Sequence, residues 1–145
     1  LPALMDQLSA RLPGGHWRDG DDSRALWATM TNLSDVAADS ILWRCPLPAG
    51  RAAALALPAG ATLRLDWGGA LAWIILPPAL ADLDVPALVA AAAGRDSHAR
   101  RLRLPDGLTS PVPAFSPPDP AVAALSRRIK ALFDPHFVLA AEAEG

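Results

Sequence analysis

The stretch ATLRLDWGGALAWIIL, residues 61–76, decides the fold of this 145-residue chain. Its first half alternates, with Leu63, Leu65 and Trp67 on one face and Arg64 and Asp66 on the other. A period of two residues predicts a β-strand with one solvent-exposed face.

The second half of this stretch predicts a turn and a return strand. Gly68 and Gly69 form a two-residue connection that can adopt the positive φ values of a tight hairpin turn. Residues 70–76 are apolar on both faces, which predicts a strand that is covered on both sides. Such a hairpin needs helices packed on it and further strands beside it.

The rest of the chain supplies these elements. The same patterns predict further strands near residues 41–47 and 98–104, and helices over residues 2–12, 85–93 and 119–133. A second helix follows a cap at Asp21, Asp22 or Ser23, and an Ala-rich crossover of helical propensity covers residues 49–57. Residues 105–118 are rich in proline, and we expect a loop there that is too irregular for a sheet.

The order strand, helix, strand, strand, helix, strand predicts an α+β fold. It is the order of a ferredoxin-like βαββαβ antiparallel sheet, here with additional N- and C-terminal helices. We therefore expect a helical lead-in over residues 1–40 and one ferredoxin-like domain over residues 41–145. The helix over residues 119–133 should dock its apolar stripe on that domain, because so short a helix is marginal in water alone.

Composition excludes several classes of function. The net charge of −2 gives no electrostatic argument for a nucleic-acid partner. No apolar run reaches the roughly 20 residues that an integral membrane helix needs. Cys45 is the only cysteine, which excludes an internal disulfide. The three histidines lack the spacing of metal ligands. The chain begins at Leu1 rather than Met, so we expect the C-terminal part of a longer protein.

Few side chains indicate chemistry from their position alone. Arg44 interrupts an apolar strand, where it can bind a carboxylate through two parallel hydrogen bonds or simply face solvent. Trp67 and Trp73 flank the hairpin turn, as core or interface anchors or as exposed aromatic rings. His98 opens the last strand and can equally be a surface histidine.

Four blocks of sequence occur in one order along the chain: Trp43-Arg44, residues 66–73 (DWGGALAW), Ser97-His98-Ala99 and residues 128–135 (RIKALFDP). With these blocks the sequence resembles the C-terminal half of the FAD-binding subunit of bacterial glycolate oxidase, over residues 22–139. It departs from that family at the hairpin, where Ala72 replaces an arginine. It departs again at residues 140–142, where the family has Asn-Pro-Gly, and at Asp96 and Ser97, where it has Gly-Gly.

The resemblance implies a cap or substrate domain of ferredoxin-like fold that closes over a flavin. It implies FAD as the cofactor, held by an N-terminal FAD-binding domain, together with other oxidase subunits and glycolate or a similar 2-hydroxy acid as substrate. This part alone is then expected to bind no flavin and to be inactive. The implied location is cytoplasmic, with peripheral attachment to the inner membrane through partner subunits.

Arg44, Trp67, Trp73 and His98 are the implied substrate- or flavin-facing positions, on one edge of the sheet. The alternative is a subunit-assembly module with the same fold and no catalytic role. A concave pocket lined by Arg44, Trp67 and Trp73 would favour the first interpretation, and a flat apolar patch would favour the second.

Overall fold

The computed structural model describes residues 2–12, 14–94, 97–136 and 138, and it divides into two compact units, Leu1–Ala37 and Ala38–Gly145. The first unit contains helices α1 (Pro2–Arg11) and α2 (Gly20–Asn32). Asp19 is the N-cap of α2 and makes no side-chain cap hydrogen bond, so the caps expected at Asp21 to Ser23 are wrong. Asp96 and residues 140–142, where the sequence departs from the family that it resembles, lie outside the described residues.

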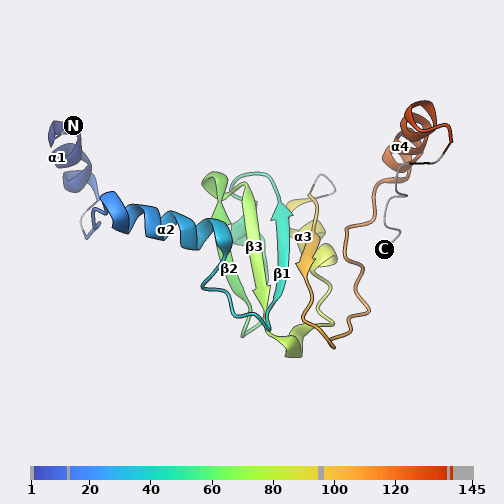
Figure 1. The fold of residues 1–145 in the computed structure, drawn as a ribbon, viewed down its shortest axis with the longest axis horizontal. Helices are drawn as coiled ribbons and strands as arrows, with labels where there is room; N and C mark the ends of the chain where they lie inside the picture. The colour runs from blue at the N-terminus through green and yellow to red at the C-terminus, as the bar shows by residue number, and fades with distance from the viewer. Residues whose placement is uncertain (1, 13, 95–96, 137, 139–145) are drawn as a thin grey trace. The chain divides into compact units, whose positions relative to one another are not determined.

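The second unit contains a four-stranded antiparallel sheet (Figure 1). Its strands are β1 (Ile41–Pro46), β2 (Thr62–Asp66), β3 (Leu71–Leu76) and β4 (Arg100–Arg103), in the spatial order β2-β3-β1-β4. The helices of this unit are α3 (Val85–Ala93) and α4 (Pro120–Phe133). The predicted α+β class is therefore confirmed, and the arrangement is compatible with a ferredoxin-like fold. All four strands are slightly shorter than expected.

The connection from β1 to β2 differs from the expectation. The helix predicted over residues 49–57 is only a 3₁₀ turn, Arg51–Ala54, in which Ala52 is the buried residue. Gly50, at φ +82°, is its N-cap. Pro58 limits the segment, and only Ala52 is fully buried in it while Leu55 and Leu57 pack against the core partly buried, so no α-helix extends over residues 49–57.

The hairpin between β2 and β3 also corrects the prediction. Asp66 pairs with Leu71, so the connection spans Trp67–Ala70 rather than two glycines. Trp67 has φ +52° and Gly68 and Gly69 have φ +63° and +88°. The Asp66 carboxylate accepts a hydrogen bond of 2.7 Å from the Trp67 amide, which holds this 3₁₀ turn.

One face of the sheet forms the core. Trp43 is 1 % exposed and lies among apolar side chains of β1, β3 and α3, together with Ala52 and Val112. Figure 1 shows α3 behind the sheet. The start of α3 follows the sequence closely, because the Asp84 carboxylate accepts a 2.9 Å hydrogen bond from the Ala87 amide. The helix ends at Ala93, as predicted, and Gly94 is its C-cap.

The opposite face of β1 and β3 carries Leu42 and Arg44 beside Leu71, Trp73 and Ile75. Leu71 and Ile75 are buried, which agrees with the prediction that β3 is covered on both faces, while Trp73 is half-buried. The Arg44 side chain points away from the core, because side chains alternate along a strand and its neighbours Trp43 and Cys45 point into the core. The candidate site lies here.

Helix α4 begins after Asp119, whose carboxylate accepts from the Ala121 amide, as its sequence predicts. Its apolar stripe is exposed, and no residue of the helix is buried. The prediction that this stripe docks on the domain is therefore wrong for the described structure. The physical reason is that α3, Ala52 and Val112 already cover the core face of the sheet. No described helix has the length and apolar run that crossing a bilayer requires.

Candidate functional site

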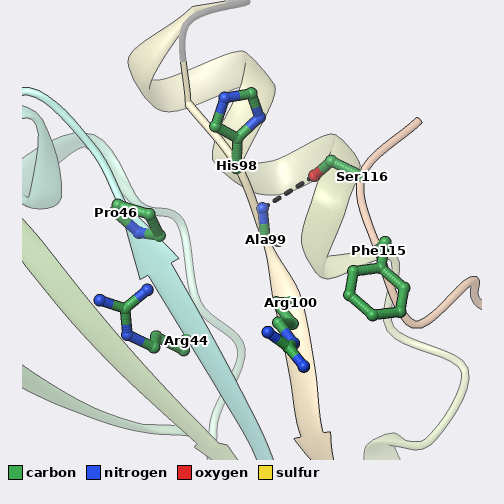
Figure 2. A pocket seen from close by; sticks show the side chains of 7 residues that line it. All are labelled: Arg44, Pro46, His98, Ala99, Arg100, Phe115 and Ser116. Carbon is green, nitrogen blue, oxygen red and sulfur yellow. Dashed lines mark hydrogen bonds between the residues drawn. The ribbon is translucent and has the colours of Figure 1, made fainter. Parts of the chain in front are cut away.

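A pocket of about 340 Å³ opens over the β1 and β4 side of the sheet (Figure 2). Three segments that are distant in sequence supply its lining: Arg44 and Pro46 from β1, His98 and Ala99 before β4 with Arg100 at its start, and Phe115 and Ser116 from the proline-rich loop. Its size lies in the range of roughly 300–1,000 Å³ that is usual for small-molecule sites.

Two arginines from neighbouring strands line this pocket. Arg44 in β1 lies directly opposite Arg100 in β4 in the antiparallel register. The Arg44 guanidinium lies over the Trp67 ring, 5.2 Å from its centroid. The Arg100 guanidinium lies over the Phe115 ring, also at 5.2 Å. Each ring attracts the cation through its electron-rich face and holds the planar group in place.

Backbone pairing holds the proline-rich loop beside β4. The Arg101 amide donates to the Ala114 carbonyl at 2.7 Å, and the Ser116 amide donates to the Ala99 carbonyl at 2.9 Å. Phe115 forms a β-bridge with Arg100. The loop that we expected to be too irregular for a sheet therefore extends its edge by a short paired segment, which places Phe115 and Ser116 at the pocket.

Ser116 has a defined role in this arrangement. Its Oγ accepts a 2.8 Å hydrogen bond from the Ala99 amide, shown dashed in Figure 2. A serine hydroxyl that accepts one hydrogen bond still has its own proton to donate. Ser116 can therefore donate to an oxygen atom of a bound molecule.

His98 is exposed and lies at one end of the pocket (Figure 2). Its backbone amide donates to the Pro46 carbonyl at 3.3 Å, which ties the segment before β4 to the end of β1. The imidazole can donate or accept a hydrogen bond. With two guanidinium groups and a hydroxyl donor, the arrangement suits an anion that has several oxygen atoms.

The structure brings the four sequence-predicted residues to one face and one end of the sheet. Arg44 and His98 line the pocket, and Trp67 contacts Arg44 through its ring. Trp73 lies opposite Arg44 on the neighbouring strand β3. The pocket is not the one expected between Arg44, Trp67 and Trp73, because it opens on the β4 side of Arg44 rather than on the hairpin side.

The sequence patterns did not identify three residues of the pocket, Arg100, Phe115 and Ser116. Arg100 lies two residues after His98, and this i, i+2 spacing on one face of the predicted strand is a signal that could have identified it. Phe115 and Ser116 reach the site because the loop pairs with β4. No sequence pattern within the loop predicts such contacts. Their positions depend on backbone hydrogen bonds that only the folded chain makes.

The N-terminus of α3 does not fit a flavin pyrophosphate. Such a group binds free amides at a helix N-terminus after a glycine-rich turn. The N-terminus of α3 instead carries the Asp84 carboxylate, and Pro86 near its start has no amide proton to donate. Among the described residues, no group of three or more His, Cys, Asp or Glu side chains could hold a metal ion.

Cys45 is buried on the core face and does not line the pocket. Burial raises the pKa of its thiol to about 12, because the low-dielectric core disfavours the thiolate. A thiol that stays protonated is a weak nucleophile. Its role is to fill space in the core.

No protein-family model, curated protein or solved structure matches this chain.

Proposed function

We propose that this chain is the C-terminal cap or substrate domain, of ferredoxin-like βαββαβ type, of an FAD-dependent 2-hydroxy-acid oxidase subunit. In this role the pocket beside Arg44 receives the carboxylate of the substrate, such as glycolate. The observation that carries the proposal is the convergence of Arg44, Arg100 and His98 on one pocket. The resemblance of the sequence blocks that contain Arg44 and His98 supports the same assignment.

The strand order supports the fold part of this proposal. A ferredoxin-like sheet places its first and third strands at the centre, and here β1 and β3 are the central strands. The first crossover uses a 3₁₀ turn where a helix is usual, and α3 serves as the second crossover. FAD and the oxidation chemistry would belong to an N-terminal domain, as the resemblance implies.

In the proposed role each group at the pocket has one task. Arg44 and Arg100 present planar N–H donors that match a carboxylate. Ser116 donates from its hydroxyl, and His98 offers a hydrogen-bonding imidazole at the end of the pocket. Phe115 and Pro46 supply apolar walls that exclude water from one side of the ligand.

Titration of the isotope-labelled chain with glycolate, followed by NMR, tests this function. We expect shifts centred on Arg44, His98, Arg100 and Ser116. Arg44→Ala should weaken binding by about tenfold, because a charge-assisted hydrogen bond contributes roughly 1.5–3 kcal/mol. Arg128→Ala is the matched control, because Arg128 is an exposed arginine of α4. Absence of any response, or equal weakening by both variants, would refute the proposal.

A second candidate function, a subunit-assembly module, is favoured by one observation. The apolar stripe of α4 is exposed, with Val122, Leu125 and Ile129 each about half accessible to solvent. Exposed apolar stripes of this kind mark interaction surfaces. This candidate predicts concentration-dependent self-association or subunit capture that Ile129→Asp abolishes, together with no response to carboxylates. Sedimentation of the unaltered chain and of Ile129→Asp would distinguish this candidate from the first.

A further inference from the structure

The pairing of Arg44 with Arg100 is unfavourable without a ligand. The two residues lie directly opposite each other on antiparallel strands, where Cα atoms are about 4.5–5.5 Å apart. Like charges in such pairs destabilise a sheet. No carboxylate is found among the described residues that line the pocket, so the lining supplies no counter-charge.

The two guanidinium groups are also held apart. Arg44 lies over Trp67, at the tip of the β2–β3 hairpin, and Arg100 lies over Phe115, from the loop beside β4. Figure 2 shows Arg44 and Phe115 on opposite sides of Arg100. A guanidinium that stacks on a ring keeps the N–H groups along its edge available for an anion. The pocket therefore offers two separate carboxylate-binding groups rather than one clamp.

We infer that the pocket takes a ligand with two separate carboxylates, a short 2-hydroxy dicarboxylate of which malate is an example, with one carboxylate at each arginine. This inference rests on the proposed function and narrows its substrate class. A monocarboxylate such as glycolate neutralises one arginine and leaves the other without a counter-charge. A dicarboxylate neutralises both and removes the repulsion between them.

The size and the remaining groups of the pocket agree with this assignment. Glycolate has only five non-hydrogen atoms and would fill a small part of the 340 Å³. A four- or five-carbon diacid is larger and carries a carboxylate at each end, one for each guanidinium group. Its hydroxyl group can then meet Ser116 or His98, which lie beside Arg100 in the lining.

Calorimetric titration of the chain at constant ionic strength tests the inference, because exposed charges are screened by salt. The probes are malate, glycolate and inorganic phosphate. We expect malate to bind at least about tenfold more tightly than glycolate, from one additional charge-assisted contact. Equal affinity for malate and glycolate, or equal affinity for malate and phosphate, would overturn the inference.

Variants of Arg100 provide the second arm. Arg100→Ala should reduce malate affinity to about that of glycolate in the unaltered chain. Arg100→Lys should recover only part of the loss, because lysine keeps the charge but lacks the planar fork. Arg128→Ala should leave malate binding unchanged, and a loss there equal to that of Arg100→Ala would overturn the inference.

The two proposals fail in different ways. If glycolate and malate bind equally well through Arg44, the dicarboxylate inference is wrong and the proposed function stands. If neither hydroxy acid shifts the resonances of Arg44 and Ser116, the proposed function is wrong, and the dicarboxylate assignment is wrong with it.

Discussion

Trp43 in β1 and Phe133 at the end of α4 are large aromatic side chains in opposite surroundings. Trp43 is 1 % exposed, whereas Phe133 is 83 % exposed. Both belong to segments with a clear apolar pattern, of period two in β1 and of helical period in α4. The two segments differ in whether other elements pack against their apolar faces. β1 lies between two strands and under α3, whereas the core of the unit is complete without α4.

This comparison shows what an apolar pattern establishes. A pattern specifies which face of an element would be buried, and the number of apolar partners decides whether it is buried. β1 pairs with both β3 and β4, so its inward residues meet partners from several elements. The stripe of α4 has a comparable pattern and lacks such partners among the buried residues of the core.

The largest effect should come from truncating the buried aromatic residue. Trp43→Ala should lower the free energy of unfolding by about 3–5 kcal/mol, because it removes buried area and leaves a cavity. The Arg101 guanidinium lies 5.4 Å from the centroid of the Trp43 ring and would lose that partner too. Urea titration measures the change. A midpoint shift corresponding to less than about 1 kcal/mol would contradict the placement of Trp43 in the core.

The buried face also contains a titratable group that sharpens the comparison. The ordinary pKa of a cysteine thiol is 9.0, and burial raises that of Cys45 to about 12. Below pH 9 both the folded and the unfolded states keep the proton, and stability is unaffected. Above it the unfolded chain releases a proton that the folded chain retains. The free energy of unfolding should therefore fall by up to about 1.4 kcal/mol per pH unit.

Few other groups interfere with this measurement, because the chain has no tyrosine and one lysine, Lys130. Unfolding in urea at steps between pH 8 and pH 11 gives the slope. Cys45→Ala is the control, and its stability should be nearly flat over the same interval. An equal slope in both proteins would show that Cys45 does not cause the loss.

The N-cap aspartates of α3 and α4 allow a comparison of the two helices with a smaller expected effect on stability. Asp84 caps α3, whose Val85 and Val89 are buried, and Asp119 caps the exposed α4. Asp84→Ala should lower the global free energy of unfolding by about 1 kcal/mol, the usual cost of losing an N-cap. Asp119→Ala should reduce the helicity of α4, seen in Cα chemical shifts, and leave the urea midpoint unchanged. Equal midpoint shifts would show that α4 unfolds with the core.

Much of the fold was predictable because the information is local. The alternation in β2, the apolar run of β3, and the cap Asp84 with Gly94 around α3 each lie within a few residues. The prediction of a helix over residues 49–57 was wrong, because helix propensity without large buried apolar side chains does not hold a helix on the sheet. The prediction of a two-residue hairpin turn was wrong, because Trp67 also adopts a positive φ and belongs to the connection.

The candidate site was predictable only in part, for the same reason. Arg44 and His98 could be singled out because each stands out in its own segment. Arg100 becomes notable only once the register sets it opposite Arg44, and Phe115 and Ser116 enter through hydrogen bonds to residues more than ten positions away. Contacts between distant segments depend on the whole fold, and no pattern within one segment reports them.

The smallest effect should come from the exposed end of α4, and it tests the comparison most directly. The apolar stripe alone would suggest that Phe133→Ala costs about 3–5 kcal/mol, as for a buried aromatic residue. At 83 % exposure the side chain has little buried area to lose, so the expected change is within about 0.5 kcal/mol. Arg128→Ala, on the polar side of the same helix, should behave alike.

Urea titrations of both variants beside Trp43→Ala decide the matter. If Phe133→Ala shifts the midpoint as far as Trp43→Ala does, α4 is docked in solution and its stripe is part of the core. A shift that grows with protein concentration has a different meaning. It indicates that Phe133 is buried between chains, because only association makes stability depend on concentration. A midpoint that is unmoved at every concentration places Phe133 in solvent, where the absence of an apolar partner outweighs the strength of the pattern.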